Sequence, residues 1–493
     1  MKNERIFIDE GSLGKKLSEE SEEDEMKTAN PSDERKQLKR SAEKEEHSKK
    51  RRIKKVLVAN RGEIALRALR TIKEMGKEAV VVYSTADKDA LYVKYADVAI
   101  CIGKERSSDS YLNIPAIISA AEISEADAIF PGYGFLSENQ NFVEICSHHK
   151  LKFIGPSVAA MALMSDKSKA KQVMQRAGVP VIPGSDGAVA DTKAAKELAK
   201  KIGYPVILKA AAGGGGRGMR VVEREEDIEK AFWSAESEAM SAFGDGTMYM
   251  EKYILNPRHI EVQIIGDSHG NVLHIGERDC SMQRRHQKLI EESPAILLDE
   301  KTRERLHETA IKAAKAIGYE GAGTFEFLVD KNLDFYFIEM NTRLQVEHTV
   351  SEMVSGLDII ELMIKVAEGE KLPSQKSIEL KGHAIECRIT AEDPNTFTPC
   401  PGKITKYVCP GGRNVRMDSH IYQDYSIPPY YDSMIGKLVV WDTDRNRAIH
   451  KMKVALDQLI ISGIKTTKDF HIAMMENKDF LSNNYDTNYL SRH

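Results

Sequence analysis

The densest group of side chains that could do chemistry lies in one stretch, 335–348, with the sequence F-Y-F-I-E-M-N-T-R-L-Q-V-E-H. Its first four residues are aromatic or β-branched, which predicts a strand. A second run of this kind occupies 323–329, and the polar segment 330–334 between them predicts a hairpin. Antiparallel pairing across this hairpin places Glu326 opposite Glu339, or within one register step of it.

Two opposed carboxylates repel each other, so this pair implies a bound cation or a raised pKa. Strand alternation places Asn341 on the same face as Glu339, and Ile338 and Met340 on the other face. Oxygen ligands from Glu326, Glu339 and Asn341 suit a hard divalent cation, Mg²⁺ or Mn²⁺. Two solvated carboxylates on a surface hairpin are the alternative interpretation.

A glycine-rich loop follows a predicted strand that ends in a lysine. The strand 204–209 ends at Lys209 and runs into 210–219, A-A-A-G-G-G-G-R-G-M. Glycine allows backbone N–H groups to approach phosphate closely, and such a loop can close over a triphosphate as a lid. The pattern is not the P-loop G-x-x-x-x-G-K-[ST]. A flexible linker is the alternative.

Three further segments carry charge that suits a nucleotide or an anion. The segment 278–288, R-D-C-S-M-Q-R-R-H-Q-K, concentrates five cationic or titratable side chains, which an anionic substrate explains better than a solvated face. Glu251, in the predicted strand 248–254, is the kind of acceptor that binds an adenine amino group, with a surface glutamate as the alternative. A helix carrying Lys167 is predicted over 163–178.

The elements before these segments alternate between strand and helix, which predicts a parallel α/β sheet. The first turn lacks G-x-G-x-x-G, so no dinucleotide site is indicated. The loop 131–138, P-G-Y-G-F-L-S-E, follows the fourth strand at the sheet edge where ligands bind in this class, and a tight structural turn is the alternative. The four strands are predicted at 55–60, 78–83, 99–102 and 128–130.

Composition excludes several classes of protein. The chain has 493 residues, enough for two to four subdomains, and a formal net charge of −4 that gives no general reason to expect nucleic acid. No secretory signal and no membrane-spanning run is expected. The six cysteines are scattered without a C-x-x-C pair, which indicates neither a zinc site nor a disulfide framework and fits a reducing cytoplasm.

The first 52 residues differ from the rest of the chain. They contain 14 basic and 14 acidic residues and a single aromatic residue, Phe7. Such a segment cannot bury enough apolar surface to offset its ordering entropy, so 1–52 is predicted to be a disordered charged tail. Its basic end at 49–52 also suits a nuclear-localisation or nucleic-acid-binding arm, but a solvated tail without a partner is the favoured interpretation.

Six motifs, taken in order and spacing, make the chain resemble biotin carboxylase, an ATP-grasp enzyme. The resemblance covers 53 to about 490, and the motifs at 278–288 and 339–348 are its most specific part. Two departures are small: Ala212 stands where the family usually has glycine, and Thr349 replaces a usual proline. The motifs are V-A-N-R-G-E-I-A at 58–65, P-G-Y-G-F-L-S-E-N at 131–139, G-G-G-G-R-G-M at 213–219, the two named above, and Y-Y-D-S-M-I-G-K at 430–437.

The resemblance implies a mixed α/β and α+β architecture. A Rossmann-like N-terminal domain with a parallel sheet is expected over 53–166. A central ATP-grasp domain, with a mobile lid at about 182–253, is expected over 167–370, and a C-terminal biotin carboxylase domain over 371–493.

The resemblance also implies a role for individual residues. Because the spacing of two continues from Glu339 to Glu347, one backbone edge is expected to serve both the metal-bound nucleotide and bicarbonate. The implied ATP contacts are Lys167, Lys209, Gly215, Gly216, Glu251, Lys252, Ile254, His259, Gln283 and His286; the metal ligands are Glu326, Glu339 and Asn341; the bicarbonate contacts are Lys288, Arg343, Gln345 and Val346; the biotin contact is Arg388; and the catalytic residues are Lys288, Arg343, Glu347 and Arg388.

The activity implied is ATP-dependent carboxylation of biotin on a separate carrier protein, with bicarbonate as the carbon source and carboxyphosphate as the intermediate. ATP and two Mg²⁺ or Mn²⁺ ions are expected. No A-M-K-M-like biotin-attachment motif occurs, so a biotin carboxyl carrier protein and carboxyltransferase subunits are expected partners of a homodimer. Acetyl-CoA carboxylase, in fatty acid biosynthesis, is the favoured assignment. A pyruvate, 2-oxo acid or other acyl-CoA carboxylase, and a nucleotide-binding scaffold without chemistry, are alternatives.

Overall fold

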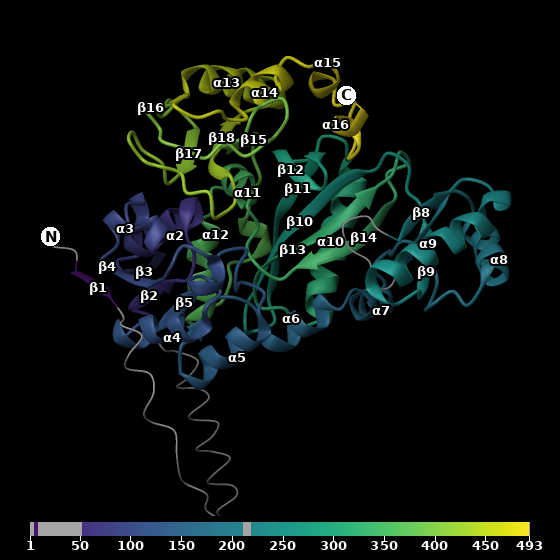
Figure 1. Ribbon diagram of the computed structural model, residues 1–493, viewed down its shortest axis with the longest axis horizontal. Coiled ribbons are helices and arrows are strands. Elements are labelled where there is room, and N and C mark those ends of the chain that lie inside the picture. Colours follow the sequence, from purple (N-terminus) through teal and green to yellow (C-terminus); the bar gives the residue numbers. More distant parts are fainter. Residues whose placement is uncertain (1–3, 8–51, 211–217, 493) are drawn as a thin grey trace, which may run out of the picture.

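The computed structural model describes residues 4–7, 52–210 and 218–492, which form three packed regions (Figure 1). The N-terminal region is a parallel sheet of six strands in the order β1-β4-β3-β2-β5-β6, as the alternation of strands and helices predicts. Its elements are β2 (Lys55–Val58), α2 (Gly62–Glu74), β3 (Glu78–Ser84), α3 (Leu91–Tyr95), β4 (Val98–Gly103), α4 (Ile114–Ile123), β5 (Ala128–Phe130), α5 (Gln140–His148) and β6 (Lys152–Phe153).

Both faces of this sheet are covered by helices, so apolar residues of its central strands are buried on both faces. Val56 and Val58 pack in the core that α2 covers, whereas Leu57 packs in the core that α4 covers. The carboxyl ends of β2 and β5 meet at one edge, and the loop 131–138 leaves the sheet there.

A short strand lies within the charged segment 1–52. Strand β1 (Glu4–Phe7) pairs in parallel with the edge strand β4 and completes the sheet edge. Residues 1–3 and 8–51 lie outside the described residues, and the disordered charged tail over 1–52 stays a prediction.

The helix predicted over 163–178 is two helices. Helix α6 (Val158–Ser165) ends before Asp166, and α7 (Lys167–Arg176) begins after it. The Asp166 carboxylate accepts hydrogen bonds from the amides of Ser168 and Lys169, which is a standard N-cap arrangement. The break places Lys167 at the first position of a helix rather than in the middle of one.

A separate three-stranded sheet in the order β8-β7-β9 carries two helices and projects from the molecule at the right of Figure 1. It falls within the predicted lid, whose mobility stays a prediction, and the glycines at 213–216 lie outside the described residues. The elements are α8 (Thr192–Ile202), β7 (Val206–Ala210), β8 (Met219–Val222), α9 (Ile228–Phe243) and β9 (Met248–Lys252).

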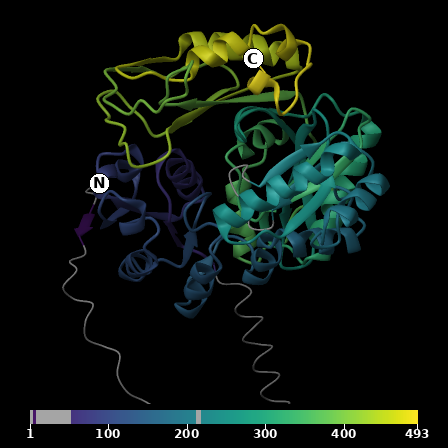
Figure 2. The same ribbon diagram turned by 45° about the vertical axis from the view of Figure 1, so that its right-hand side comes forward.

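An antiparallel sheet of eight strands in the order β14-β13-β10-β11-β12-β15-β18-β17 continues without a break from the central region into the C-terminal region (Figures 1 and 2). The elements of the central region are the strands and helices β10 (Arg258–Gly266), β11 (Val272–Arg284), β12 (Gln287–Ser293), α10 (Glu300–Ala316), β13 (Gly321–Val329), β14 (Phe335–Asn341), α11 (His348–Ser355) and α12 (Ile359–Ala367). Its C-terminal elements are β15 (His383–Thr390), β17 (Val415–Ser419) and β18 (Met434–Asp442).

The remaining C-terminal elements cover the far side of this sheet at the top of Figure 1. They are β16 (Lys406–Val408), α13 (Arg445–Gln458), β19 (Ile460–Ser462), α14 (Lys468–Met474), α15 (Lys478–Leu481) and α16 (Tyr489–Arg492). Of the helices in the described ranges, none has the length and apolar character needed to span a membrane.

The central strands have one apolar and one polar face. Val262 of β10 and Phe325 of β13 pack under α10, whereas their sequence neighbours Glu261 and Glu326 lie on the opposite face. This second face carries the functional groups.

A bulge changes the predicted alternation in β14. Phe327 pairs with Phe337 and Glu326 pairs with Glu339, so Ile338 is an extra residue on this strand. Ile338 consequently lines the same cleft as Glu339 instead of facing away from it. The predicted pairing of Glu326 with Glu339 is confirmed.

Buried charges fix α10 to the sheet. Glu277 of β11 accepts a hydrogen bond from Arg303 Nε at 2.9 Å and contacts His307 Nε2 at 2.7 Å. Burial alone would raise the pKa of Glu277, but its hydrogen bond to His307 and the charges of His307 and Arg303 lower the pKa to about 2.

We expect Glu277→Gln to destabilise the protein at pH 7 by on the order of 2 kcal/mol. The stability from a depressed carboxyl pKa is present above the unfolded value of about 4.5 and is lost as the pH falls toward 2. The difference in thermal midpoint between wild type and variant should therefore narrow from pH 5 to pH 3. Glu300→Gln, which removes an exposed partner of the same Arg303, is the control; a pH-independent difference would contradict the assignment.

Candidate active site

A cleft of about 1600 Å³ opens where the three regions meet, and it gathers most of the predicted site residues. The loop after β5 contributes Tyr133 and Phe135, as expected for the carboxyl edge of a parallel sheet. Among the described residues predicted for the site, those that line the cleft are Lys167, Lys209, Lys252, Ile254, His259, Gln283, His286, Lys288, Glu326, Glu339, Asn341, Arg343, Gln345, Val346, Glu347 and Arg388.

The Lys288 ammonium lies at the centre of three carboxylates. Its Nζ donates to Glu261 at 2.6 Å, to Glu326 at 2.9 Å and to Glu347 at 2.6 Å. An ammonium has three N–H donors, so all of them are engaged. Burial would lower the pKa of Lys288, but the three carboxylates raise it well above its usual value, so the group is charged.

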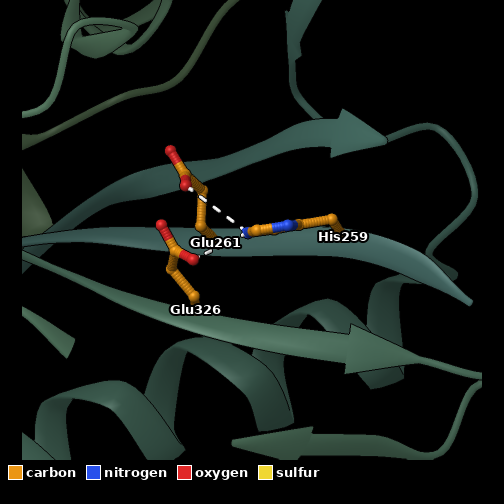
Figure 3. A group of neighbouring side chains, drawn as sticks. All are labelled: His259, Glu261 and Glu326. Atoms are coloured by element: carbon orange, nitrogen blue, oxygen red, sulfur yellow. Dashed lines mark ion pairs between the residues drawn. The ribbon is translucent and has the colours of Figure 1, made fainter. Parts of the chain in front are cut away.

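His259, Glu261 and Glu326 converge from two neighbouring strands (Figure 3). His259 Nε2 lies 3.0 Å from Glu326 and 3.9 Å from Glu261. Glu326 also accepts hydrogen bonds from Asn341 at 2.8 Å and Gln345 at 3.1 Å. Burial raises the pKa of Glu326, but Lys288 and His259 outweigh it and hold the pKa well below its usual value.

The carboxylate pair Glu326 and Glu339 is stabilised by cations rather than by a raised pKa at Glu326. Glu326 is paired with Lys288, and Glu339 lies 3.2 Å from Lys167. Together with Asn341, the two glutamates present only oxygen ligands on one wall of the cleft, which is the donor chemistry that Mg²⁺ and Mn²⁺ prefer.

Glu347 is held between two cations. Its two oxygens accept from Lys288 at 2.6 Å and from Arg388 Nη2 at 2.8 Å. Burial raises its pKa, but Lys288 and Arg388 lower the pKa well below the usual value, so the carboxylate is ionised. Glu347 does not continue the strand, because β14 ends at Asn341 and Glu347 caps α11. The prediction of one continuous backbone edge is therefore wrong.

The loop 343–347 between β14 and α11 has the carbonyl groups of 344–347 bound, whereas its amides have no acceptor among the described residues. Gln345 O lies 2.8 Å from His348 Nδ1, and Val346 O accepts from Lys437 Nζ at 2.8 Å. The amides of Val346 and Glu347 donate to no acceptor within the described residues. Free, adjacent N–H groups of this kind form an anion-binding site.

Arg343 keeps much of its charge available to a ligand. Its guanidinium donates to Asn341 Oδ1 at 2.8 Å and to Gln345 Oε1 at 3.0 Å, which are neutral acceptors. Its one carboxylate partner among the described residues is Glu138, at 2.9 Å, which lies in the partly exposed loop after β5. The planar fork therefore suits an anion that replaces these contacts.

Arg388 comes from the C-terminal part of the eight-stranded sheet. Its Nε donates to Glu291 at 2.6 Å and its Nη2 to Glu347 at 2.8 Å. Burial alone would lower the pKa of Arg388, but the charges of Glu291 and Glu347 outweigh burial and raise the pKa above its usual value. The side chain is therefore a fixed cation at the wall of the cleft.

The structure places Glu251 behind the cleft wall, and its role as an adenine acceptor stays a prediction. Its carboxylate does not line the cleft and binds Lys171 at 2.8 Å and Lys209 at 2.7 Å. Lys209 does line the cleft, so Glu251 orients a cleft lysine from behind. Gly215 and Gly216 lie outside the described residues.

The basic segment 278–288 divides between two environments. Arg285 and His286 form the tip of the β11–β12 hairpin with φ of 50° and 66°, and both line the cleft. Arg278 is fully buried beneath the cleft, and Arg284 stacks on Phe397. The interpretation of the whole cluster as an anion site is therefore wrong for Arg278 and Arg284. Arg278 is paired with the buried Glu261 carboxylate, and Arg284 is stacked on the Phe397 ring.

Arg278 and Glu261 form a pair that sequence reasoning missed. Arg278 Nε donates to Glu261 at 2.5 Å, and its other donors reach Gln263, Ser351 and Thr324. Glu261 in turn binds Lys288. The alternation of polar and apolar residues in the strand at 258–263 could have indicated this pair, because a glutamate on a buried face needs a cation as partner.

Comparison with known proteins gives matches along the described body of the chain. The family models for the biotin carboxylase N-terminal domain, the carbamoyl-phosphate synthase L chain ATP-binding domain and the biotin carboxylase C-terminal domain match residues 52–161, 166–375 and 386–492. The chain is 56% identical to a biotin carboxylase from a Nostoc species over 438 residues, which is 88% of this chain and 98% of that protein.

Solved structures agree with these matches. A Campylobacter jejuni biotin carboxylase in a β-γ-ATP complex is 84% identical with a TM-score of 0.84, covering 90% of this chain and 99% of that one. The biotin carboxylase domain dimer of Hydrogenobacter thermophilus 2-oxoglutarate carboxylase, with MgADP, ADP and bicarbonate, is 49% identical with a TM-score of 0.82, covering 90% and 98%.

We expect Arg278→Met to destabilise the protein by about 3–5 kcal/mol, because Glu261 is left as a buried and under-compensated charge. The double variant R278M/E261M removes both partners and should recover most of this loss. Thermal unfolding of Arg278→Met, Glu261→Met and the double variant is the measurement. A double variant whose loss of stability equals the sum of the two single losses would contradict the pairing.

Proposed function

Because this chain belongs to the biotin carboxylase family and is an ATP-dependent carboxylase, we propose that it carboxylates biotin held on a separate carrier protein, with bicarbonate as the source of carbon. The observation that carries this proposal is the arrangement around Lys288. In this proposal the side of the cleft with Lys167, Lys209 and His259 is the nucleotide wall, and the side with Arg343, Val346 and Glu347 is the anion wall. The Lys288 ammonium connects the two walls, because it binds Glu326 on the first and Glu347 on the second.

The anion wall suits bicarbonate in charge and size. Lys288 and Arg343 supply positive charge, and the free amides of Val346 and Glu347 supply neutral donors. Binding of bicarbonate requires Lys288 and Arg343 to give up part of their present contacts. The cations then share their charge with the ligand, which weakens the hold of Lys288 on Glu347 and raises the basicity of that carboxylate.

Glu347 is the base that removes the bicarbonate proton as the oxygen attacks the γ-phosphate of ATP. The lysines Lys167 and Lys209 and the imidazole of His259 bind and orient the nucleotide from the opposite wall. The bond between the γ-phosphorus and the β-phosphate oxygen breaks, so carboxyphosphate and ADP form. Carboxyphosphate then decomposes to CO₂ and phosphate in a site from which water is excluded.

Glu326, Glu339 and Asn341 would hold the divalent cation. When bound, Mg²⁺ or Mn²⁺ offsets the charge that develops on the phosphate oxygens. The oxygen-only donor set fits such an ion, provided that Lys167 and Lys288 release the two glutamates. Displacement of these lysines frees their charge for the phosphates and for bicarbonate.

Arg388 acts at the biotin end. Phosphate takes the proton from N1′ of biotin, and the Arg388 guanidinium stabilises the enolate that forms. N1′ then attacks the carbon of CO₂, and the new C–N bond gives carboxybiotin. Arg388 is suited to this role because Glu291 fixes its Nε while its terminal nitrogens remain at the cleft.

The same proposal covers the partners. A biotin carboxyl carrier protein and carboxyltransferase subunits complete the enzyme, and two copies of this chain form a cytoplasmic homodimer. Acetyl-CoA is proposed as the final acceptor. A 2-oxo acid or another acyl-CoA is the alternative, since a 2-oxoglutarate carboxylase is 49% identical to this chain over the matched part.

The purified protein should cleave ATP in the presence of Mg²⁺ and free biotin at high concentration, and only when bicarbonate is added. Arg343→Gln should lower this rate on the order of 10²–10³-fold, as for loss of an oxyanion donor. Phosphate release measures both. Arg284→Gln, which removes a cation of the same segment outside the cleft, is the control and should keep the wild-type rate. Bicarbonate-independent cleavage, or none, by folded wild type would overturn the proposal.

Capture of the tagged chain from its native cells should recover a biotinylated protein together with carboxyltransferase subunits. Their acyl-CoA or 2-oxo acid specificity, measured by transfer of labelled bicarbonate, decides the acceptor. Carboxylation of a 2-oxo acid rather than acetyl-CoA would contradict the acceptor proposed above.

A further inference from the structure

Lys437 of β18 is a fully buried lysine that does not line the cleft. Its Nζ donates to the Val346 carbonyl at 2.8 Å and lies 3.3 Å from Glu63 Oε1. We propose that Lys437 is a positioning residue that sets the backbone of the loop 343–347 for bicarbonate. This inference rests on the bicarbonate site proposed above.

The first argument is the register of β15 and β18. Arg388 and Lys437 are directly paired across these strands, so their side chains extend from the same face of the sheet. They contact consecutive residues: Arg388 binds the Glu347 carboxylate and Lys437 binds the Val346 carbonyl. The C-terminal region therefore holds the loop through two adjacent cations. Arg388 binds a side chain of the loop, and Lys437 binds its backbone.

The second argument is the geometry of the peptide group. A trans peptide is planar, so its N–H points in the direction opposite to its C=O. The hydrogen bond from Lys437 to Val346 O therefore fixes the direction of the Glu347 N–H as well. That amide belongs to the loop amides that have no acceptor among the described residues.

The third argument is the link to the N-terminal region. Glu63 lies in the first turn of α2, and its carboxylate has no hydrogen-bond partner within the described part of the chain. The pKa of Glu63 is raised to about 7, mainly by burial. The charge of Lys437 lowers this pKa, and the charges of Asp418 and Glu386 add to the increase. One ammonium thus connects all three regions at the loop that carries Gln345 and Glu347.

The same surroundings make substitution of Lys437 feasible. Without the ammonium, the pKa of Glu63 rises above its present value near 7, so the carboxyl takes up a proton and no isolated buried charge is left. Lys437→Met fills the volume of the lysine stem and removes the N–H donor, and it leaves the Val346 carbonyl without this partner.

We expect Lys437→Met to raise KM for bicarbonate on the order of 10–100-fold while KM for ATP changes less than about threefold, because misplacement affects the anion wall alone. Hydrogen exchange gives a readout that needs no activity. The amides of 343–347 should exchange about tenfold faster or more in the variant, because the loop loses its backbone restraint.

Lys77→Met is the matched control. Lys77 Nζ also donates to a backbone carbonyl, that of Ile53, at 2.7 Å, and pairs with a glutamate, Glu368, at 2.7 Å. These contacts lie away from the cleft. Lys77→Met should lower the thermal midpoint, as Lys437→Met does, and leave KM for bicarbonate and exchange at 343–347 unchanged.

The outcomes separate this inference from the proposed function. If wild type shows no bicarbonate-dependent ATP cleavage, the proposed function fails, and exchange at 343–347 still tests the positioning role. If wild type is active and Lys437→Met matches the Lys77→Met control in bicarbonate KM and in exchange, the inference is overturned. Lys437→Leu, which likewise has no hydrogen-bond donor, replaces Lys437→Met if that variant does not fold, and the same results are required of it.

Discussion

The site depends on a single ammonium that three carboxylates share. Lys288 holds Glu326, Glu347 and Glu261 within 2.9 Å. The three carboxylates differ in their other contacts, because Glu326 also binds Asn341, Glu347 also binds Arg388 and Glu261 is fixed by Arg278 from below. A pair of these glutamates alone would repel. The lysine lets them approach, and its charge becomes available to a ligand only as a carboxylate leaves. In the proposed function, binding of the nucleotide and binding of bicarbonate are coupled through this lysine.

The large antiparallel sheet makes this arrangement possible. Its strands alternate so that an apolar face packs under α10 while the other face carries Glu261, Arg278, Lys288 and Glu326. Cations and carboxylates on that face neutralise each other while buried, which removes most of the cost of placing charge in the interior. The loop 343–347 lines the same cleft and is held from two neighbouring strands: Arg388 of β15 binds the Glu347 carboxylate, and Lys437 of β18 binds the Val346 carbonyl.

The sequence predicted the parts of the site that follow from local pattern. Pairing of Glu326 with Glu339 could be predicted because a polar turn separates two strand-forming runs. The bulge at Ile338 could not, because Phe337 and Ile338 are both apolar and either can face the core. The burial of Arg278 and the capture of Glu251 by Lys171 depend on partners far along the chain, which composition and spacing do not indicate. Roles for most single residues came from the family resemblance rather than from pattern.

The unbroken ladder from β12 to β15 has a mechanical consequence. A hinge between the central and C-terminal regions would have to break backbone hydrogen bonds in the middle of a sheet, so these regions move as one rigid frame. Among the described residues, the small sheet β8-β7-β9 forms no ladder with this frame. The segment before the small sheet is joined to β14 of the frame by an isolated bridge between Val181 and Phe337. A movement of the small sheet relative to this frame therefore breaks no sheet ladder. Arg388 belongs to the frame, so the cleft wall that it forms keeps its shape wherever the small sheet lies.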